Sequence, residues 1–302
     1  MPKKVVITGA TGFVGKYLSI YLLGKGIDIV PVSLRETLDP ACFVNADSII
    51  HLAGKAHDMK NETDTDAYFA INTELTKKVY DTFLQSNASV FIFMSSVKAV
   101  RDHAEGIVTE QTDPKPGTVY GISKRRAEEY IESKQPVVGK KYFILRPCMI
   151  HGPGNKGNLN LLYKFIENDI PYPLGAFQNR RSFLSVENLC FVINNIIRDN
   201  KFPSGIYNVA DDEALSTNDL IIEINTCLRK KVKIWKISKS LIMVLARISD
   251  TLHLPFTTAR LNKLTESYEV SNAKIIKALK INLPVSSRDG IRKTINSFKI
   301  SQ

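Results

Sequence analysis

A strand-to-helix turn at the start of the chain constrains the fold more than any other feature. The apolar run Val5–Thr8 leads directly into a glycine-rich turn, and an apolar helical pattern follows. Gly9 allows a sharp bend, Gly12 lets the backbone approach a pyrophosphate, and Gly15 lets helix and strand pack closely. Free N–H groups at the helix start attract the anion. The turn therefore predicts a dinucleotide site made by Gly9, Thr11, Gly12, Phe13, Val14 and Gly15.

Short β-rich runs alternate with helical patterns through the first half of the chain. The runs are Val5–Thr8, Ile29–Val32, Ser48–Leu52, Val90–Met94 and Tyr142–Leu145. They lack strict alternation of apolar and polar residues, as strands buried on both faces should. We therefore predict an α/β protein with a doubly wound parallel sheet and helices on both faces.

After Arg146-Pro147 the pattern becomes less regular, and a smaller, interleaved C-terminal region begins. We predict a dinucleotide-binding domain over residues 1–147, to which residues 183–210 return, and a substrate-binding region over 148–182 and 211–302. The expected helices of this half are Leu159–Glu167, Val186–Arg198, Thr217–Arg229 and Ser238–Thr251, with a strand at Gly205–Ala210. The apolar stretch Leu241–Ala246 is too short to span a bilayer and is interpreted as a core helix.

The composition excludes several classes of protein. Of the 302 residues, 44% are apolar and 24% are charged, which is typical of a soluble chain with a large core. The four cysteines show neither zinc-site spacing nor close pairing, so we expect reduced thiols, no metal and a cytoplasmic location. The net charge of +11 is spread along the chain, so we interpret it as a solvated surface with no nucleic-acid or membrane partner.

The residues after the second strand bear on cofactor choice. An NAD-selective site usually places a carboxylate at this strand tip, and the chain has Ser33 and Arg35 instead. A guanidinium suits the 2′-phosphate of NADP because it binds phosphate by charge and by a two-pronged fork. We therefore predict that the enzyme prefers NADP to NAD. Two alternatives remain: Glu36 could supply the missing carboxylate, or Arg35 could be a solvated loop charge.

Tyr120 and Lys124 are the candidate acid/base pair. Positions four apart share a face of a helix, so Lys124 can lie beside Tyr120 and favour its phenolate. The run Val90–Met94 ends in Ser95-Ser96, whose hydroxyls can reach the same substrate carbonyl. We predict that Ser96 hydrogen-bonds the substrate oxygen and that Tyr120 moves the proton while the cofactor moves hydride. The same spacing occurs at Tyr21/Lys25 and Tyr130/Lys134, but within helices, where surface pairs are the default.

Together these features resemble the NAD-dependent epimerase/dehydratase family, whose fold is of the Rossmann type. The resemblance extends to His51-Leu52-Ala53-Gly54 and to Leu145-Arg146-Pro147 before His151-Gly152-Pro153-Gly154. Met94-Ser95-Ser96-Val97-Lys98 and residues 152–158 look like the UDP-glucose 4-epimerase-like subgroup, which includes UDP-4-keto-6-deoxy-N-acetylhexosamine 4-reductases. The resemblance implies a homodimer, cofactor contacts from Leu52, Ala53, Gly54 and Ser95, and contacts to a UDP-linked sugar from Asn158, Leu159, Tyr172 and Arg181.

The sequence departs from the family pattern in three places. Too little chain lies between Arg35 and Asp47 for the usual third strand, which carries an adenine-contacting aspartate. Met149 stands where many sugar epimerases have a substrate-contacting asparagine. Val97-Lys98 replaces the Asp-Glu pair of the 4,6-dehydratases, which argues against a dehydratase.

The resemblance implies action at sugar C4 and a place in surface polysaccharide biosynthesis, and Arg35 with the shortened adenine side favours a reductase within this subgroup. A reductase releases its cofactor after each turnover, whereas a 4-epimerase holds NAD tightly, and the shortened adenine side with Arg35 fits release better. A UDP-sugar 4-epimerase is the first alternative. A non-catalytic NAD(P)-sensing protein is the second, although such proteins commonly lose the tyrosine or the lysine that this chain keeps.

Overall fold

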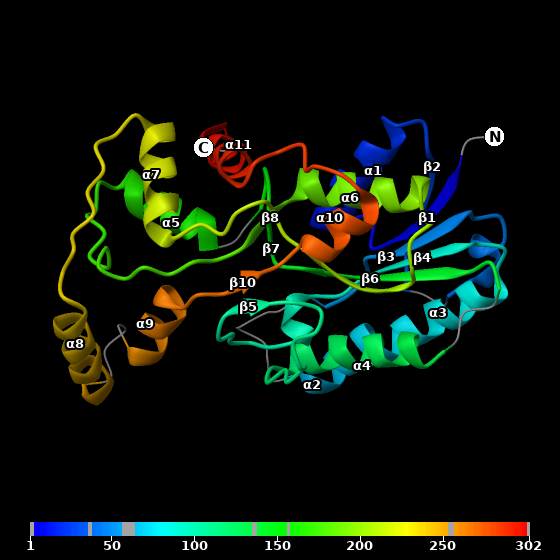
Figure 1. Ribbon diagram of the computed structural model, residues 1–302, viewed down its shortest axis with the longest axis horizontal. Coiled ribbons are helices and arrows are strands. Elements are labelled where there is room, and N and C mark those ends of the chain that lie inside the picture. The colour runs from blue at the N-terminus through cyan, green and yellow to red at the C-terminus, as the bar shows by residue number, and fades with distance from the viewer. Residues whose placement is uncertain are drawn as a thin grey trace.

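The computed structural model describes residues 3–35, 38–55, 64–134, 138–155, 158–252 and 257–300. Its centre is a six-stranded sheet in which all neighbouring strands are parallel (Figure 1). The strand order is β2 (Asp28–Val32), β1 (Lys4–Thr8), β3 (Ser48–His51), β4 (Val90–Met94), β6 (Lys141–Pro147) and β9 (Gly205–Val209). The parallel sheet and the positions of its strands confirm the predicted fold class.

Helices cover both faces of the sheet, as a doubly wound topology requires. Helices α1 (Phe13–Leu23) and α6 (Val186–Arg198) pack together on one face, with α10 (Ala273–Leu279) beside β9 (Figure 1). Helices α3 (Leu75–Gln85) and α4 (Val119–Ser133) cover the other face. Each face has its own apolar core, so the strands are buried on both sides.

Strand β2 lies at the edge of the sheet, next to β1. In the described chain between β2 and β3, the structure has a short 3-10 helix at Pro40–Phe43 and no further strand. Phe43 is fully buried among the apolar residues of the α3 face. The expected loss of the family's third strand is therefore confirmed for the described residues, and a single helical turn packs against that part of the core.

A second apolar core lies beyond the carboxyl edge of the sheet. It is built by α5 (Asn158–Glu167), α7 (Thr217–Leu228), α8 (Lys239–Thr251), α9 (Thr258–Thr265) and α11 (Ser287–Ile300). Two small parallel sheets lie between the halves and pair β7 (Met149–His151) with β8 (Phe183–Ser185), and β5 (Ile107–Val108) with β10 (Glu269–Val270). In Figure 1, α8 lies at the end of the molecule away from the sheet, with α9 beside it and α5 and α7 at the same end.

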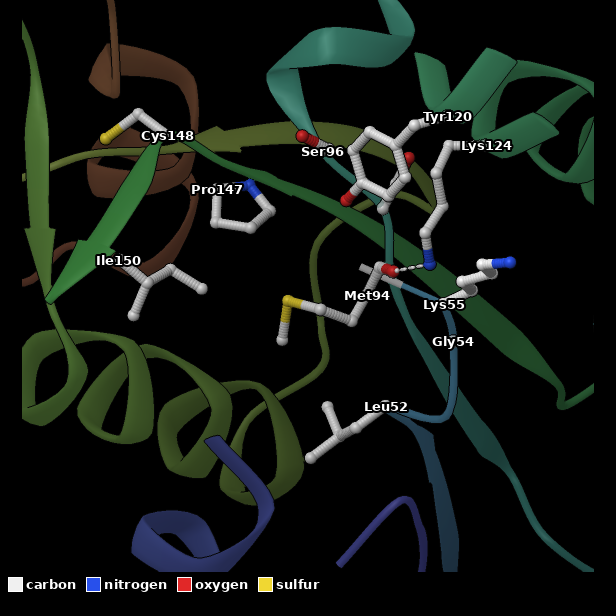
Figure 2. Close-up of a pocket in the computed structure, with 11 residues that line it drawn as sticks. Leu52, Gly54, Lys55, Met94, Ser96, Tyr120, Lys124, Pro147, Cys148 and Ile150 are labelled. Carbon is white, nitrogen blue, oxygen red and sulfur yellow. Dashed lines mark hydrogen bonds between the residues drawn. The ribbon is translucent and has the colours of Figure 1, made fainter. Parts of the chain in front are cut away.

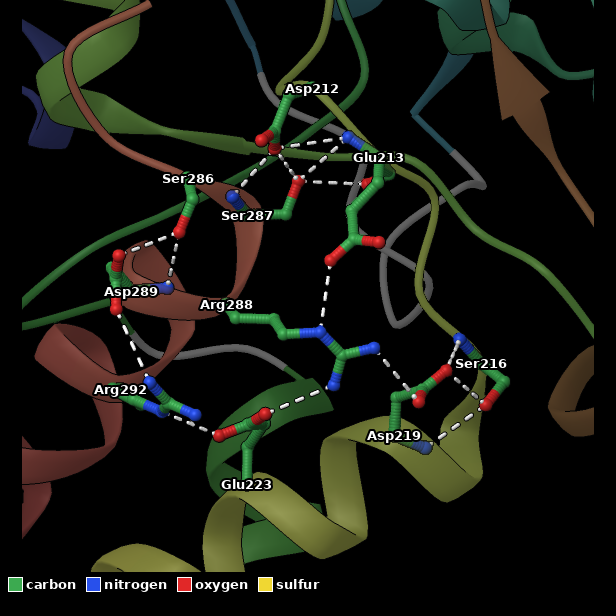
Figure 3. A network of polar contacts seen from close by, with 10 residues as sticks. All are labelled: Asp212, Glu213, Ser216, Asp219, Glu223, Ser286, Ser287, Arg288, Asp289 and Arg292. Carbon is green, nitrogen blue, oxygen red and sulfur yellow. Dashed lines mark hydrogen bonds and ion pairs between the residues drawn. The ribbon is translucent and has the colours of Figure 1, made fainter.

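Charged side chains fasten the C-terminal helix α11 to α7 (Figure 3). The guanidinium of Arg288 reaches Glu213, Asp219 and Glu223, and that of Arg292 also binds Glu223. Glu223 is buried, so its two arginine partners satisfy a carboxylate that would otherwise be costly to desolvate. This network fixes the last helix against the second core.

Helix α8 differs from its prediction as a core helix. Ile242 and Ala246 are buried in the second core, but Leu241, Val244 and Leu245 are each about half exposed. The prediction is wrong for one face of the helix, because apolar residues surround most of its circumference and hydropathy alone does not tell a buried face from an exposed one.

Gly15 is a position where the fold leaves no room for a side chain. An added Cβ would lie 2.3 Å from the carbonyl oxygen of Gly9 and 2.6 Å from Cα of Ala10. We expect Gly15→Ala to lower the free energy of unfolding by about 1–3 kcal/mol through overpacking, measured by denaturant titration. The control is Gly24→Ala, where φ is −65° and the nearest atoms would lie 3.5 Å away. Equal stability of the two variants would contradict the packing role.

Candidate active site

A cavity of about 220 Å³ opens at the carboxyl ends of the central strands (Figure 2). This is the edge where open α/β sheets bind their ligands. The loop after β3, strands β4, β6 and β7, and helix α4 all contribute to its wall. The lining residues are Leu52, Gly54, Lys55, Met94, Ser95, Ser96, Tyr120, Lys124, Pro147, Cys148 and Ile150.

The glycine turn lies beside this cavity and fits a dinucleotide pyrophosphate. Gly9 has φ +72°, and an added Cβ would lie 2.7 Å from the backbone nitrogen of Ala53, next to the cavity residues Leu52 and Gly54. Helix α1 begins at Phe13 and Val14, directly after Thr11-Gly12, and Gly12 caps it without any side-chain hydrogen bond. The first N–H groups of α1 are thus available to an anion, in keeping with the predicted cofactor site.

Tyr120 and Ser96 meet across the cavity (Figure 2). Thr118 caps α4 by accepting a hydrogen bond from the N–H of Gly121, which places Tyr120 in the first turn of the helix. The Tyr120 side chain shares a hydrogen bond with Ser96, and its ring lies edge-on to Tyr68 at 6.3 Å. The two predicted catalytic hydroxyls are therefore brought together.

Burial controls the acidity of Tyr120. Desolvation raises the pKa of its phenol above the ordinary value, and the hydrogen bond with Ser96 offsets only part of this effect. The sequence predicted the opposite direction, with the charge of Lys124 favouring the phenolate. That expectation is wrong in direction for the described site, because desolvation of the buried phenol is the largest effect on its pKa. The phenol therefore keeps its proton at neutral pH.

Lys124 lies one helical turn from Tyr120 and enters the same cavity (Figure 2). Its Nζ donates a 2.9 Å hydrogen bond to the carbonyl oxygen of Met94 at the end of β4. Burial lowers the pKa of Lys124 to about 8, and Glu128 acts in the opposite direction. Burial and the charge of Lys124 lower the pKa of the buried His51 to about 3, so the His51 ring is neutral.

Asn72 is a site residue that the sequence reasoning missed. It is fully buried in a π-helical segment, Phe69–Glu74, between α2 (Thr65–Tyr68) and α3. Its side chain accepts from the N–H of Lys55 and donates to Ser123 Oγ, 2.8 and 3.0 Å away. A Cβ on Gly54 would lie 3.0 Å from both Asn72 Oδ1 and Lys124 Nζ. Because π-bulges often mark functional sites, we assign Asn72 to the wall behind Lys124.

The sequence analysis also missed the buried ion pair of Glu128 and Arg146. Glu128 follows Tyr120 and Lys124 on the same face of α4 and is fully buried. It accepts from Arg146 at 2.6 and 2.8 Å and from Ser95 Oγ at 2.5 Å. Ser95 lines the cavity, and its hydroxyl donates to Glu128. The spacing of residues 120, 124 and 128 could have revealed the pair. It places Glu128 on the helix face of the two catalytic candidates, and a buried carboxylate needs a partner.

Ser33 and Arg35 follow the end of β2, which pairs with β1 just before the glycine turn. Both are exposed, and the N–H of Arg35 donates to Ser33 Oγ at 3.5 Å. This placement is where the adenosine ribose would be expected, so their role in binding a 2′-phosphate stays a prediction. Glu36, the alternative carboxylate, lies outside the described residues.

The predicted substrate residues are placed differently from the catalytic ones. Leu159 and Tyr172 are buried in the second core and do not line the described cavity. The guanidinium of Arg181 donates to the carbonyl oxygens of Lys263 and Glu266 at the end of α9. Asn158 opens α5, but its side chain lies outside the described part of the structure. The substrate contacts of these residues therefore remain predictions.

The sheet, the glycine turn and the Ser96–Tyr120–Lys124 cavity together are typical of a dinucleotide-dependent enzyme. The family model "NAD dependent epimerase/dehydratase family" matches residues 5–210. The chain therefore belongs to this family, as the resemblance indicated.

Relatives in the family include nucleotide-sugar epimerases and reductases. The chain is 30% identical to a UDP-glucose 4-epimerase of Vibrio cholerae, covering 78% of this chain and 80% of that protein. It is 27% identical to the N-acetyl-alpha-D-glucosaminyl-diphospho-ditrans,octacis-undecaprenol 4-epimerase of Escherichia coli O157:H7, covering 92% and 86%. It is also 30% identical to a UDP-2-acetamido-2,6-beta-L-arabino-hexul-4-ose reductase of Pseudomonas aeruginosa, covering 52% of this chain and 38% of that one. The chain is thus an NAD-dependent enzyme of the epimerase and reductase class.

Solved structures share the fold along nearly the whole chain. The UDP-glucuronic acid 4-epimerase of Bacillus cereus in complex with NAD has a TM-score of 0.77 at 18% identity, with 99% of this chain and 100% of that chain covered. RMD of Pseudomonas aeruginosa complexed with NADPH has a TM-score of 0.73 at 19% identity, with 99% and 100% covered. These likenesses establish the Rossmann-type architecture.

Proposed function

We propose that this enzyme transfers hydride at C4 of a UDP-linked hexose, and that Ser96, Tyr120 and Lys124 catalyse the reaction. The observation that carries the proposal is the meeting of these three side chains in one cavity beside the glycine turn. That cavity is where a nicotinamide and a sugar ring would have to meet. The family membership of the chain supports the same class of chemistry.

The cofactor, when bound, supplies or accepts the hydride. For reduction, Ser96 Oγ hydrogen-bonds the C4 ketone oxygen and polarises the carbonyl. Tyr120 Oη gives that oxygen its proton, so that the carbonyl becomes an alcohol and the phenol becomes a phenolate. The ammonium group of Lys124 would stabilise this phenolate, and Lys124 is the residue that would hold the ribose of a bound cofactor. Bulk water then returns the proton to Tyr120.

The protonation state of Tyr120 is compatible with the reductive direction. Its phenol carries a proton at neutral pH, and ketone reduction requires a proton donor at this place. Arg35 at the tip of β2 and the short 3-10 helix in place of a third strand suit an NADP cofactor that is released after each turnover. We therefore propose a UDP-4-keto-6-deoxy-N-acetylhexosamine 4-reductase in surface polysaccharide biosynthesis, acting as a homodimer through α3 and α4.

A UDP-sugar 4-epimerase is the second candidate. It is favoured by the two relatives described above that cover most of this chain, both of which are named 4-epimerases. An epimerase returns the hydride to the sugar it came from, so Tyr120 would have to act as base and then as acid in each turnover. Such an enzyme needs no added reductant.

The deciding experiment compares the two reactions on one purified sample. UDP-4-keto-6-deoxy-N-acetylglucosamine is supplied with NADPH or NADH, and UDP-N-acetylglucosamine is supplied without added cofactor. We expect consumption of reduced cofactor, faster with NADPH, and a 4-hydroxy product identified by NMR and mass spectrometry. Efficient formation of UDP-N-acetylgalactosamine without cofactor would reverse the ranking, and no turnover of either substrate would favour a cofactor-sensing role.

The buried amine of Lys124 predicts the pH dependence of the reduction. Its pKa is lowered to about 8, so the ammonium is present below that pH and is lost above it. Tyr120 keeps its proton throughout this range because its own pKa is raised. We expect a steady turnover rate below about pH 8 and a fall above it. Lys124→Arg should move the fall to higher pH, since a guanidinium stays charged. A wild-type rate that is constant well above pH 8 would contradict this assignment.

A further inference from the structure

Helix α8 carries an exposed apolar stripe. Leu241, Val244, Leu245, Ile248 and Leu252 follow helical spacing on and just after α8, and their exposures lie between 48% and 62%. The opposite side of the helix is anchored in the second core by Ile242 and Ala246. A monomeric soluble protein rarely leaves a continuous apolar helical face in water, so this stripe calls for a covering surface.

The segment that leads into α8 extends this apolar surface. Trp235 is 57% exposed and Val232 is 47% exposed. The backbone of Trp235 is held in place by hydrogen bonds with Tyr172 and Gly175, so its ring is presented from a fixed point. Leu264, in α9 beside α8, is 48% exposed. Tryptophan is enriched where a protein meets the headgroup region of a bilayer.

The same part of the chain is strongly basic. Residues 229–265 contain nine lysines and arginines and a single acidic residue, Asp250. The basic residues are Arg229, Lys230, Lys231, Lys233, Lys236, Lys239, Arg247, Arg260 and Lys263. The charge of the chain is therefore less evenly spread than its overall composition indicated. Lys230 and Lys233 form ion pairs with Asp169, and the others include Lys239 and Arg247 within α8 itself. Lysines and arginines close in sequence to an exposed apolar helical face are typical of a segment that lies on an anionic membrane.

We propose that the α8–α9 end of the protein docks on the surface of an anionic phospholipid bilayer, with the α8 stripe and Trp235 entering the headgroup region. Charge selects this occupant over a second copy of the chain, because two such basic ends facing each other would repel. Among the described residues, no helix is long and apolar enough to cross a membrane. The contact is thus a surface contact, and it replaces the earlier expectation of no membrane partner.

The position of this end permits docking without disturbing the fold. In Figure 1, α8 lies at the outer end of the half opposite the six-stranded sheet, with α9 beside it, and the stripe residues of α8 are about half exposed. The inference does not depend on the proposed reaction, since it concerns lipid binding alone. It can be tested without substrate or cofactor.

The test uses Trp235, the one tryptophan of the chain, as its own reporter. Full-length protein is mixed with vesicles of phosphatidylcholine alone or with added phosphatidylglycerol, and tryptophan emission and vesicle flotation are measured. We expect a blue shift and flotation only with the anionic vesicles, both weakened by salt. Absence of binding, or equal binding to neutral vesicles, would overturn the proposal.

Matched variants separate docking from misfolding. Leu245→Glu with Ile248→Glu should abolish flotation, whereas Ile20→Glu with Leu23→Glu, on the exposed side of α1, should leave it unchanged. Lys231→Gln and Lys236→Gln keep the apolar stripe and should weaken vesicle binding about fivefold each, since one lysine near an anionic surface contributes about 1 kcal/mol. Analytical ultracentrifugation completes the test. An oligomer that the α8 variant dissociates, in a protein that binds no vesicles, would assign the stripe to a second copy and refute membrane docking.

Discussion

Replacing Tyr120 with phenylalanine is expected to lower the turnover rate by about 100- to 10,000-fold, the usual contribution of a positioned general acid. The variant keeps the aromatic ring and its packing beside Tyr68 and loses only the hydroxyl that meets Ser96. The free energy of unfolding and the affinity for cofactor should therefore change little. Steady-state turnover and cofactor titration on the same sample measure the two effects separately.

The control for this variant comes from the same helix. Tyr130 also has a lysine four residues later, and its hydroxyl donates to Asp81 at 2.8 Å, away from the cavity. Tyr130→Phe should retain normal turnover, because the spacing of tyrosine and lysine has no catalytic value outside the cavity. Full activity of the Tyr120 variant on every UDP-sugar tested would remove the acid/base assignment.

The parts of the site that depend on local sequence were predictable. The turn from β1 into α1 needs only the spacing of Gly9, Gly12 and Gly15, and the shared face of Tyr120 and Lys124 follows from helix geometry. The missing third strand followed from counting the residues between β2 and β3. In each case the residues that determine the feature are close in sequence, at most one strand-to-strand connection apart.

Features set by distant contacts were not predictable from the same reasoning. Asn72 gains its meaning from the backbone of Lys55 and from Ser123, far from it in sequence. Arg181 looked free to bind a diphosphate, yet carbonyl groups more than eighty residues later accept from its guanidinium. A side chain's polar partners depend on the assembled fold, which local periodicity does not describe.

The acidity of the catalytic phenol shows the same limit for electrostatics. Spacing correctly placed Lys124 near Tyr120, but the sign of the pKa shift depends on how deeply the phenol is buried. The exposed stripe of α8 is a further example, because the same apolar residues serve a core or a surface equally well. The sequence determines which ionisable and apolar groups are present, whereas the fold determines how deeply each is buried and therefore its pKa.

The buried pair of Glu128 and Arg146 is expected to dominate the stability of the site. Glu128→Gln leaves the Arg146 guanidinium, which is 1% exposed, facing an amide in place of a carboxylate. Breaking one side of a buried ion pair costs about 3–5 kcal/mol of unfolding free energy. The neighbouring Glu129→Gln removes only a half-exposed partner of Arg125 and should cost about 0.5 kcal/mol or less. Denaturant titration of both variants tests this contrast.

The pair also connects stability to catalysis, because Glu128 accepts from Ser95, next to the catalytic Ser96, and lies on the helix face of Tyr120 and Lys124. The double variant Glu128→Leu with Arg146→Met leaves no unpaired charge, so it should be more stable than either single variant. It should still have low turnover, since Ser95 loses the acceptor that anchors the end of β4 to α4. A double variant that is as unstable as the singles would mean that packing, rather than the unpaired charge, carries the cost. Normal turnover in the double variant would show that Glu128 has no positioning role.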